Sequence, residues 1–306
     1  MFSMVFGPTL DVLKLRRAFA SSPPTQITQE PFDSSPKHLK TLVRLHPGDR
    51  AEPGDLWDYT QDLLYSSAIQ GPLLTYLLPF CLEAWRDDLR GTHSGYGGFV
   101  EYFYPVLANK HVFDEYLTPT QTMAVSEFMR ESILEEINAQ RGLTFKGTDA
   151  PYRWITALAT YGVLLPDVDQ LWTGWWSIET VGRAVATVQY VSCLMYPEDE
   201  NPVFAPWTPD RGGGPPCLWE FGGHLYEHRW LDPNIRFLQQ VLNPKEIDVA
   251  LSGAIERLVG LPEQQVAAEV QSDIPLCAET LAARCTQLPR LLETKQSPGK
   301  LLEWKK

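Results

Sequence analysis

The sequence TPTQTMAVSEFMRESILEEINAQRG, residues 118–142, carries the clearest structural signal in this chain of 306 residues. Thr118 and Gln121 have the spacing of a capping box, and Pro119 suits the first helical position. Gly142 supplies a stop, because glycine accepts the left-handed backbone that ends many helices. The segment is therefore predicted to be an amphipathic helix. Its apolar residues recur at helical spacing and form the expected buried face: Val125, Phe128, Met129, Ile133 and Ile137.

Another face of this predicted helix carries a row of carboxylates. Glu127, Glu131 and Glu135 fall four residues apart and share one side of the helix, with Glu136 beside them. Like charges at this spacing destabilise a helix by about a few tenths of a kcal/mol per pair. The row has two interpretations. It is either a solvated helix face or a docking surface for a basic partner.

The acidity of the chain is local to the region that ends with this helix. Residues 51–140 contain fourteen Asp and Glu against four Lys and Arg, so they carry a net charge of about −10 of the −12 of the whole chain. Residues 1–50 hold seven Lys and Arg against four Asp and Glu. The isoelectric point near 5.0 argues against nucleic acid or an anionic membrane as the direct ligand, since both require basic patches.

Helix signals in the rest of the chain predict a mainly α protein with two packed helical regions. Asp55 follows Pro53-Gly54 and suits an N-cap, and Gly71-Pro72 marks the start of the next helix. A second capping box stands at Asn243-Pro244-Lys245-Glu246. The apolar segment 181–196 is β-branched at several positions, which leaves open a small β element in the C-terminal half.

The predicted organisation has four parts. An N-terminal segment and connector at 1–50 precedes an acidic helical domain at 51–142. A second, mainly helical domain spans 151–292, and a tail follows at 293–306. The polar segment 142–151 is the expected boundary between the two domains, because it follows a well-marked helix end.

Several features predict a cytoplasmic protein that does not enter a membrane. Five cysteines without a CxxC pair suit reduced thiols better than a disulfide framework. The first residues lack the positively charged region of a secretory signal. The apolar run 73–82 falls short of the roughly twenty residues needed to span a bilayer, so we expect it to be a core helix.

One motif points to a metal site. His224-Leu225-Tyr226-Glu227-His228 has the H-x-x-E-H pattern of inverted zinc peptidases, in which two His bind the metal and the Glu polarises a bound water. Glu303 is the candidate third ligand. However, Gly222-Gly223 weakens a helix at this position, and Glu303 stands close to the last residue. A zinc-dependent hydrolase using His224, His228 and Glu303 is the alternative interpretation of the chain.

No other catalytic signature is present in the sequence. The chain has no G-x-S-x-G elbow, no P-loop and no dinucleotide fingerprint, so we expect a protein that is not an enzyme and has no cofactor. A third interpretation is a carbohydrate-binding platform at Trp172, Trp175 and Trp176, although large aromatic residues more often fill cores and interfaces.

Three segments resemble a known class of protein: Pro72–Pro79, Ala84–Leu89 and Tyr116–Gln121. Over about residues 40–142 the chain resembles bacterial immunity proteins that accompany secreted toxins, including type VI secretion effectors. In particular, it is similar to the cognate inhibitor of a nuclease toxin with a restriction-endonuclease-like domain. The resemblance implies a non-catalytic protein that occludes its toxin, and it transfers no catalytic residues. An acidic surface would suit the basic groove of a nuclease domain.

The contact surface is accordingly predicted within residues 51–140. The first choice is the carboxylate row Glu127, Glu131 and Glu135. A second site is expected either at Asp58 and Asp62 or at Asp87 and Asp88, because charges at an interface guide encounter and fix register. Large aromatic residues are frequent anchors at the centre of interfaces. The predicted anchors are Trp57, Trp85 and Tyr96.

Overall fold

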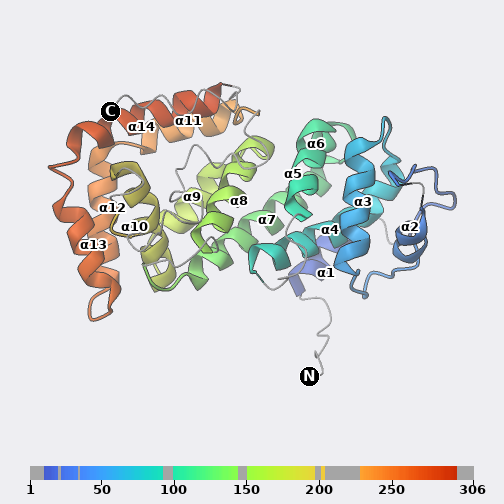
Figure 1. The fold of residues 1–306 in the computed structure, drawn as a ribbon, viewed down its shortest axis with the longest axis horizontal. Coiled ribbons are helices and arrows are strands. Elements are labelled where there is room, and N and C mark those ends of the chain that lie inside the picture. Colours follow the sequence, from blue (N-terminus) through green and yellow to red (C-terminus); the bar gives the residue numbers. More distant parts are fainter. Residues whose placement is uncertain are drawn as a thin grey trace. The chain divides into compact units, whose positions relative to one another are not determined.

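The computed structural model describes residues 10–19, 22–33, 35–91, 99–143, 150–196, 201–203 and 228–294. Within these ranges the chain forms fourteen helices and no strand, which confirms the predicted mainly α fold (Figure 1). The β-branched segment for which a strand was left open is helix α10, Val181–Met195. The chain divides into two compact units, here called the N-terminal unit, residues 1–132, and the C-terminal unit, residues 133–306. The division falls within helix α7, before the polar segment 142–151.

The N-terminal unit is built around α4, which packs against α1, α3 and α5. Its residues from Tyr76 to Glu83 are all buried, and the helix continues through Pro79. Helix α3 contacts both α2 and α5 (Figure 1). The helices of this unit are α1 (Leu10–Arg17), α2 (Lys37–Leu42), α3 (Pro53–Tyr65), α4 (Gly71–Leu89), α5 (Phe99–Asn109), α6 (Val112–Glu115) and the first part of α7 (Pro119–Ala139).

Local signals explain where two of these helices begin. Thr118 and Gln121 form the predicted capping box at the start of α7. The Gln121 backbone N–H donates to Thr118 Oγ1 (3.3 Å), and the Thr118 N–H donates to Gln121 Oε1 (2.9 Å). The start of α3 was predicted wrongly, because Glu52 occupies the N-cap position and Asp55 lies in the first turn. Pro53 causes this shift, since its fixed φ favours the first helical position.

The C-terminal unit encloses α10, which contacts α9, α12, α13 and α14. Every residue of α10 from Ala184 to Met195 is buried. A helix without a continuous polar face lies inside a protein, and the buried hydroxyls of Thr187 and Ser192 donate to backbone carbonyls of α10 itself. The other helices of this unit are α8 (Ala150–Leu164), α9 (Val168–Trp176), α11 (Asp232–Val241), α12 (Pro244–Arg257), α13 (Glu263–Ser272) and α14 (Ala278–Glu293).

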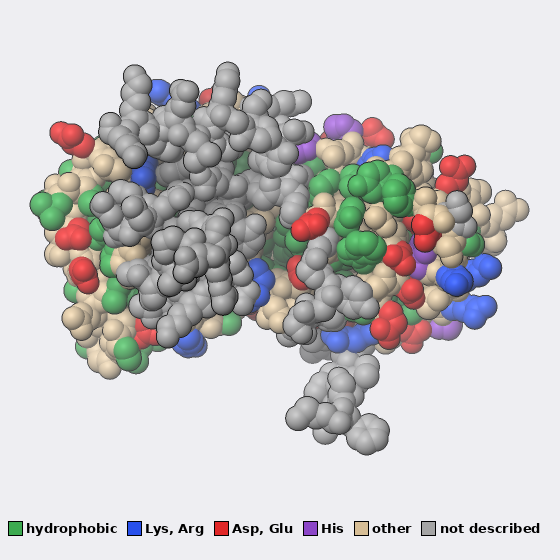
Figure 2. All heavy atoms as spheres, in the orientation of Figure 1, with side chains coloured by type: hydrophobic (Ala, Val, Ile, Leu, Met, Phe, Trp, Pro, Cys, Tyr) green, Lys and Arg blue, Asp and Glu red, His purple; other side chains and the backbone are tan. Residues whose placement is uncertain are grey.

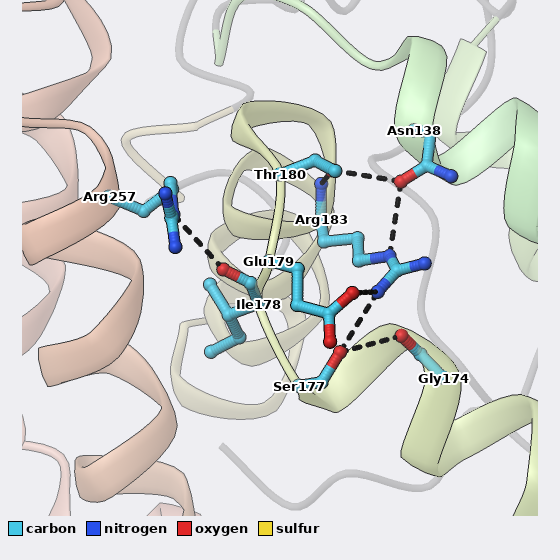
Figure 3. Close-up of polar contacts among 8 residues, drawn as sticks. All are labelled: Asn138, Gly174, Ser177, Ile178, Glu179, Thr180, Arg183 and Arg257. Carbon is cyan, nitrogen blue, oxygen red and sulfur yellow. Dashed lines mark hydrogen bonds and ion pairs between the residues drawn. The ribbon is translucent and has the colours of Figure 1, made fainter.

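A polar junction joins the end of α7 to the start of α10 (Figure 3). Thr180 caps α10 by accepting a hydrogen bond from the Arg183 backbone N–H (3.2 Å). The side-chain oxygen of Asn138 accepts from Thr180 Oγ1 (2.8 Å) and from Arg183 Nε (3.1 Å). Gly182 makes this close approach possible, because a Cβ at that position would meet the backbone carbonyls of Ile137 and Asn138. The junction therefore depends on a residue without a side chain.

Candidate protein-binding surface

The carboxylate row on α7 is partly neutralised by other parts of the chain. Glu127 accepts an ion pair from Lys14 of α1, and Glu131 lies 3.5 Å from Arg130 Nε. Glu131 and Glu135 are exposed, whereas Glu136 is buried. Glu127 and Glu131 belong to the N-terminal unit, and Glu135 belongs to the C-terminal unit. Fewer carboxylates of this row are therefore available to pair with a partner protein than the sequence suggests.

The Asp87 and Asp88 pair is also engaged within the N-terminal unit. Arg50 Nη2 lies 3.5 Å from Asp87 Oδ2, and Arg50 Nε lies 3.4 Å from Glu83 Oε1. Asp88 is half-buried and makes further polar contacts. Arg16 donates to Glu83 Oε2 at 2.6 Å in a buried ion pair. Three of the seven basic residues in the first fifty positions, Lys14, Arg16 and Arg50, therefore pair with the acidic region and cancel part of its charge.

Two predicted contact residues are buried and are corrected here. Trp85 is 0% exposed, and its indole N–H donates to the Tyr104 hydroxyl (2.7 Å). Asp62 is 3% exposed; its Oδ1 accepts from the Phe32 backbone N–H (2.7 Å), and its Oδ2 lies 2.5 Å from His38 Nε2. Both side chains are held inside the unit because α3 and α4 turn these positions inward. Tyr96, a third predicted anchor, lies outside the described residues.

Of the remaining predicted residues, Trp57 lies at a surface formed by α3 and α5, and Asp58 follows it on α3, within electrostatic reach of Asp33 and His38. Trp57 packs edge-on against Tyr102 of α5, with ring centroids 5.2 Å apart. Tyr102 also lies 6.4 Å from Tyr65, which stacks on Phe32 at 4.5 Å. We call Phe32, Trp57, Tyr65 and Tyr102 the aromatic patch. Figure 2 shows hydrophobic side chains at the surface over α3 and α5, with acidic side chains beside them.

Carboxylates flank the aromatic patch. Asp33 is next to Phe32 in the chain, Glu101 is next to Tyr102, and Asp58 lies two turns before Tyr65 on the same side of α3. Among the described residues, no cation lies within ion-pair distance of Asp58 or Glu101. Among the described residues these two carboxylates therefore lack an ion-pair partner, although the imidazole of His38 acts on Asp58.

Partial burial is the main influence on the pKa of two carboxyl groups on α3. Partial burial raises the pKa of Asp58, and the charges of Asp33 and Asp62 raise it further, while His38 acts in the opposite direction. Partial burial likewise raises the pKa of Asp55, with Asp58 and Glu52 adding to the effect. A cation that approaches a partly buried carboxylate offsets the cost of desolvating its charged form. The face of α3 is thus electrostatically prepared for a positively charged ligand.

The sequence identified only part of this surface. Trp57 and Asp58 were predicted, but Phe32, Tyr65 and Tyr102 were not. Tyr65 stands eight residues after Trp57 on one helix, and this spacing could have suggested a shared side. Phe32 lies in the Pro- and Ser-rich connector, and no local pattern indicates that it stacks on α3.

The alternative sites fare differently. Residues 224–227 of the H-x-x-E-H motif and Glu303 lie outside the described residues, so the zinc site stays a prediction. Within the described ranges, no group of three or more His, Cys, Asp or Glu is arranged to hold a metal ion.

The predicted carbohydrate-binding platform of tryptophans is wrong for two of its three members. Trp172 and Trp175 are 2% and 0% exposed and pack on Tyr190 at 5.3 and 5.1 Å, so they form a core cluster.

Two of the cysteines are unsuited to nucleophilic chemistry. Cys81 and Cys285 are buried, and burial raises the pKa of both thiols, that of Cys285 to about 11. Since the thiolate is the reactive species, these two groups are unreactive near neutral pH.

Comparison with known proteins adds no relative to this picture. No family model matches the chain, and neither a curated protein nor a solved structure shows significant similarity to it. Among the described helices, none combines the length and the apolar character needed to cross a membrane. The surface over α3 and α5 is therefore interpreted from its own geometry.

Proposed function

We propose that this chain is a non-catalytic immunity protein that binds and neutralises a cognate bacterial toxin in the cytoplasm. The toxin is expected to be a nuclease effector with a basic domain, of the kind delivered by type VI secretion. The observation that carries the proposal is the α3–α5 surface, where exposed aromatic rings stand beside carboxylates without a cation of their own among the described residues. Interfaces commonly combine an aromatic centre with a charged rim.

Occlusion explains how such a surface would inhibit a nuclease. A nuclease domain must present a cationic groove to its substrate, so an acidic protein competes for the same surface. Complementary charges speed the encounter, while buried aromatic contacts slow dissociation. The carboxylates of α7 would contribute to this long-range attraction, with Glu131 the more exposed of the two in the N-terminal unit.

The first test is whether a toxin-like reading frame neighbours the gene of this chain, and the product of such a frame is then the partner in the assays. Co-expression should restore growth of cells that carry the toxin, and the purified chain should inhibit its nuclease activity at a one-to-one ratio. An Asp58→Lys/Glu101→Lys variant should associate roughly tenfold more slowly at low salt, because both reversals act on the proposed contact surface.

A matched control keeps the same change in net charge. Glu256 and Glu279 are exposed on α12 and α14, which belong to the C-terminal unit, whereas the proposed surface belongs to the N-terminal unit. The Glu256→Lys/Glu279→Lys variant should protect cells as well as the parent does. An equal loss of protection in both variants would show that only the net charge of the chain matters. If the parent chain does not inhibit the nuclease, the immunity function is refuted.

A further inference from the structure

The aromatic patch exposes two of its rings while fixing their positions. Phe32 and Tyr65 are 55% and 56% exposed, yet they stack face to face at 4.5 Å with an interplanar angle of 29°. Tyr102 and Trp57 continue the patch onto α5 and the start of α3. An isolated apolar side chain at the surface is ordinary, but a contiguous aromatic group marks a contact site.

The connector that carries Phe32 is held in place by side chains of α3 and of the turn before α4. The carboxylate of Asp62 accepts from the Phe32 N–H at 2.7 Å, and the side-chain oxygen of Gln70 accepts from the N–H groups of Thr28 and Gln29 at 2.8 and 3.2 Å. Gln70 Nε2 in turn donates to the Gln26 carbonyl oxygen (2.6 Å). Phe32 is therefore presented to solvent by a prepared scaffold, which lowers the entropic cost of binding.

The charges around the aromatic patch determine whether it favours a cationic or an anionic ligand. Asp33 and Glu101 adjoin Phe32 and Tyr102 in the chain, and Asp58 lies on the same side of α3 as Tyr65. Lys110 reaches this end of α3, where its ammonium group donates to the Ser66 carbonyl oxygen (2.6 Å) and keeps its positive charge, so these three carboxylates outnumber this single cation. A ligand that covers the rings therefore meets negative charge at their edge, which favours a cation.

We infer that the aromatic patch docks an arginine-bearing basic segment of the partner protein, with the guanidinium lying on the exposed rings and pairing with Asp58 or Asp33. Arginine fits because its planar guanidinium stacks on aromatic faces and bonds carboxylates in a fixed fork, whereas the lysine ammonium is a compact, strongly hydrated charge. The inference rests on the proposed function only in taking the partner to be a basic protein.

The test uses two synthetic nonapeptides of equal charge, one with four arginines and one with four lysines in a Gly-Ser background. Fluorescence anisotropy measures their binding to the full chain. We expect the arginine peptide to bind more tightly, and the Phe32→Ala/Tyr65→Ala variant to bind it about three- to thirtyfold more weakly while its lysine-peptide affinity changes little. Met123→Ala is the matched control, because Met123 is 71% exposed on α7, outside the patch.

The outcomes separate this inference from the toxin assignment. Equal affinity for the two peptides, or an arginine preference that survives in the Phe32→Ala/Tyr65→Ala variant, would refute the docking chemistry. Circular dichroism of that variant should match the parent, since both rings are at the surface. Ring-dependent arginine preference without protection of cells would refute the immunity function alone, whereas protection without this preference would refute the docking chemistry alone.

Discussion

Gly182 provides the sharpest test of how the C-terminal unit packs. In the structure a Cβ at this position would lie 2.6 Å from the Ile137 carbonyl oxygen and closer still to that of Asn138. Both neighbours are backbone atoms of α7, so no side chain can rotate away to make room. A Gly182→Ala variant must therefore move α10 relative to the end of α7, which disturbs the hydrogen bonds of Asn138 with Thr180 and Arg183 (Figure 3).

The magnitude follows from two opposing effects. Overpacking against a rigid neighbour costs about 1–3 kcal/mol, and a disturbed hydrogen bond adds about 1 kcal/mol. Gly182 lies in the first turn of α10, and alanine there returns no more than about 0.5–1 kcal/mol, because glycine has the greater conformational freedom when unfolded. The net expectation for Gly182→Ala is a loss of about 2 kcal/mol in the free energy of unfolding.

Gly253 of α12 supplies the matched control. Its added Cβ would meet only the Ile178 Cδ1 atom within 4 Å, at an ordinary contact distance of 3.5 Å. Gly253→Ala should therefore stabilise the protein by about 0.5–1 kcal/mol through helix propensity alone. Urea unfolding followed by tryptophan fluorescence measures both variants. If Gly182→Ala unfolds at the parent midpoint or above it, the close approach of α10 to α7 is wrong.

Three further predictions concern the N-terminal unit. Asp62→Ala should lower the free energy of unfolding by about 3 kcal/mol, because it removes the buried partner of His38 and of the connector. A decrease of less than about 1 kcal/mol, measured by thermal unfolding, would contradict this. Burial alone would lower the pKa of His38, but the hydrogen bond and charge of Asp62 outweigh burial and raise it. The stabilisation from this pair is therefore complete below the unfolded pKa of histidine, about 6.5. It is lost as the pH rises through the raised pKa of the folded state. The stability difference between the parent and a His38→Gln variant should accordingly be larger at pH 5.5 than at pH 8.5, and equal differences would refute the pairing. Lys14→Met should change the free energy of unfolding by less than about 1 kcal/mol, because the ion pair of Lys14 with Glu127 is exposed. A larger decrease, measured by chemical denaturation, would show that the ion pair has a structural role.

The sequence determined the helices by signals that act within a few residues. The Thr118–Gln121 box and the Asn243 cap, whose side-chain oxygen accepts from the Glu246 N–H at 3.0 Å, could be predicted because both partners of each bond lie in one helical turn. The buried face of α7 followed in the same way from helical spacing, and Val125, Met129 and Ile133 are each 0% exposed. These interactions require no knowledge of the rest of the chain.

The tertiary structure alone decided which charges and rings a partner can reach. Arg16 and Arg50 cancel carboxylates some thirty to seventy residues away in sequence, and Asp62 turns inward to bind His38. Phe32 reaches Tyr65 across a connector without periodicity. A count of charges along the chain cannot anticipate these contacts, because ion pairs and ring stacks form between residues that folding brings together. The sequence therefore determined that residues 51–140 are acidic and mainly helical, whereas packing decided that the α3–α5 surface has exposed aromatic rings beside carboxylates without an ion-pair partner among the described residues.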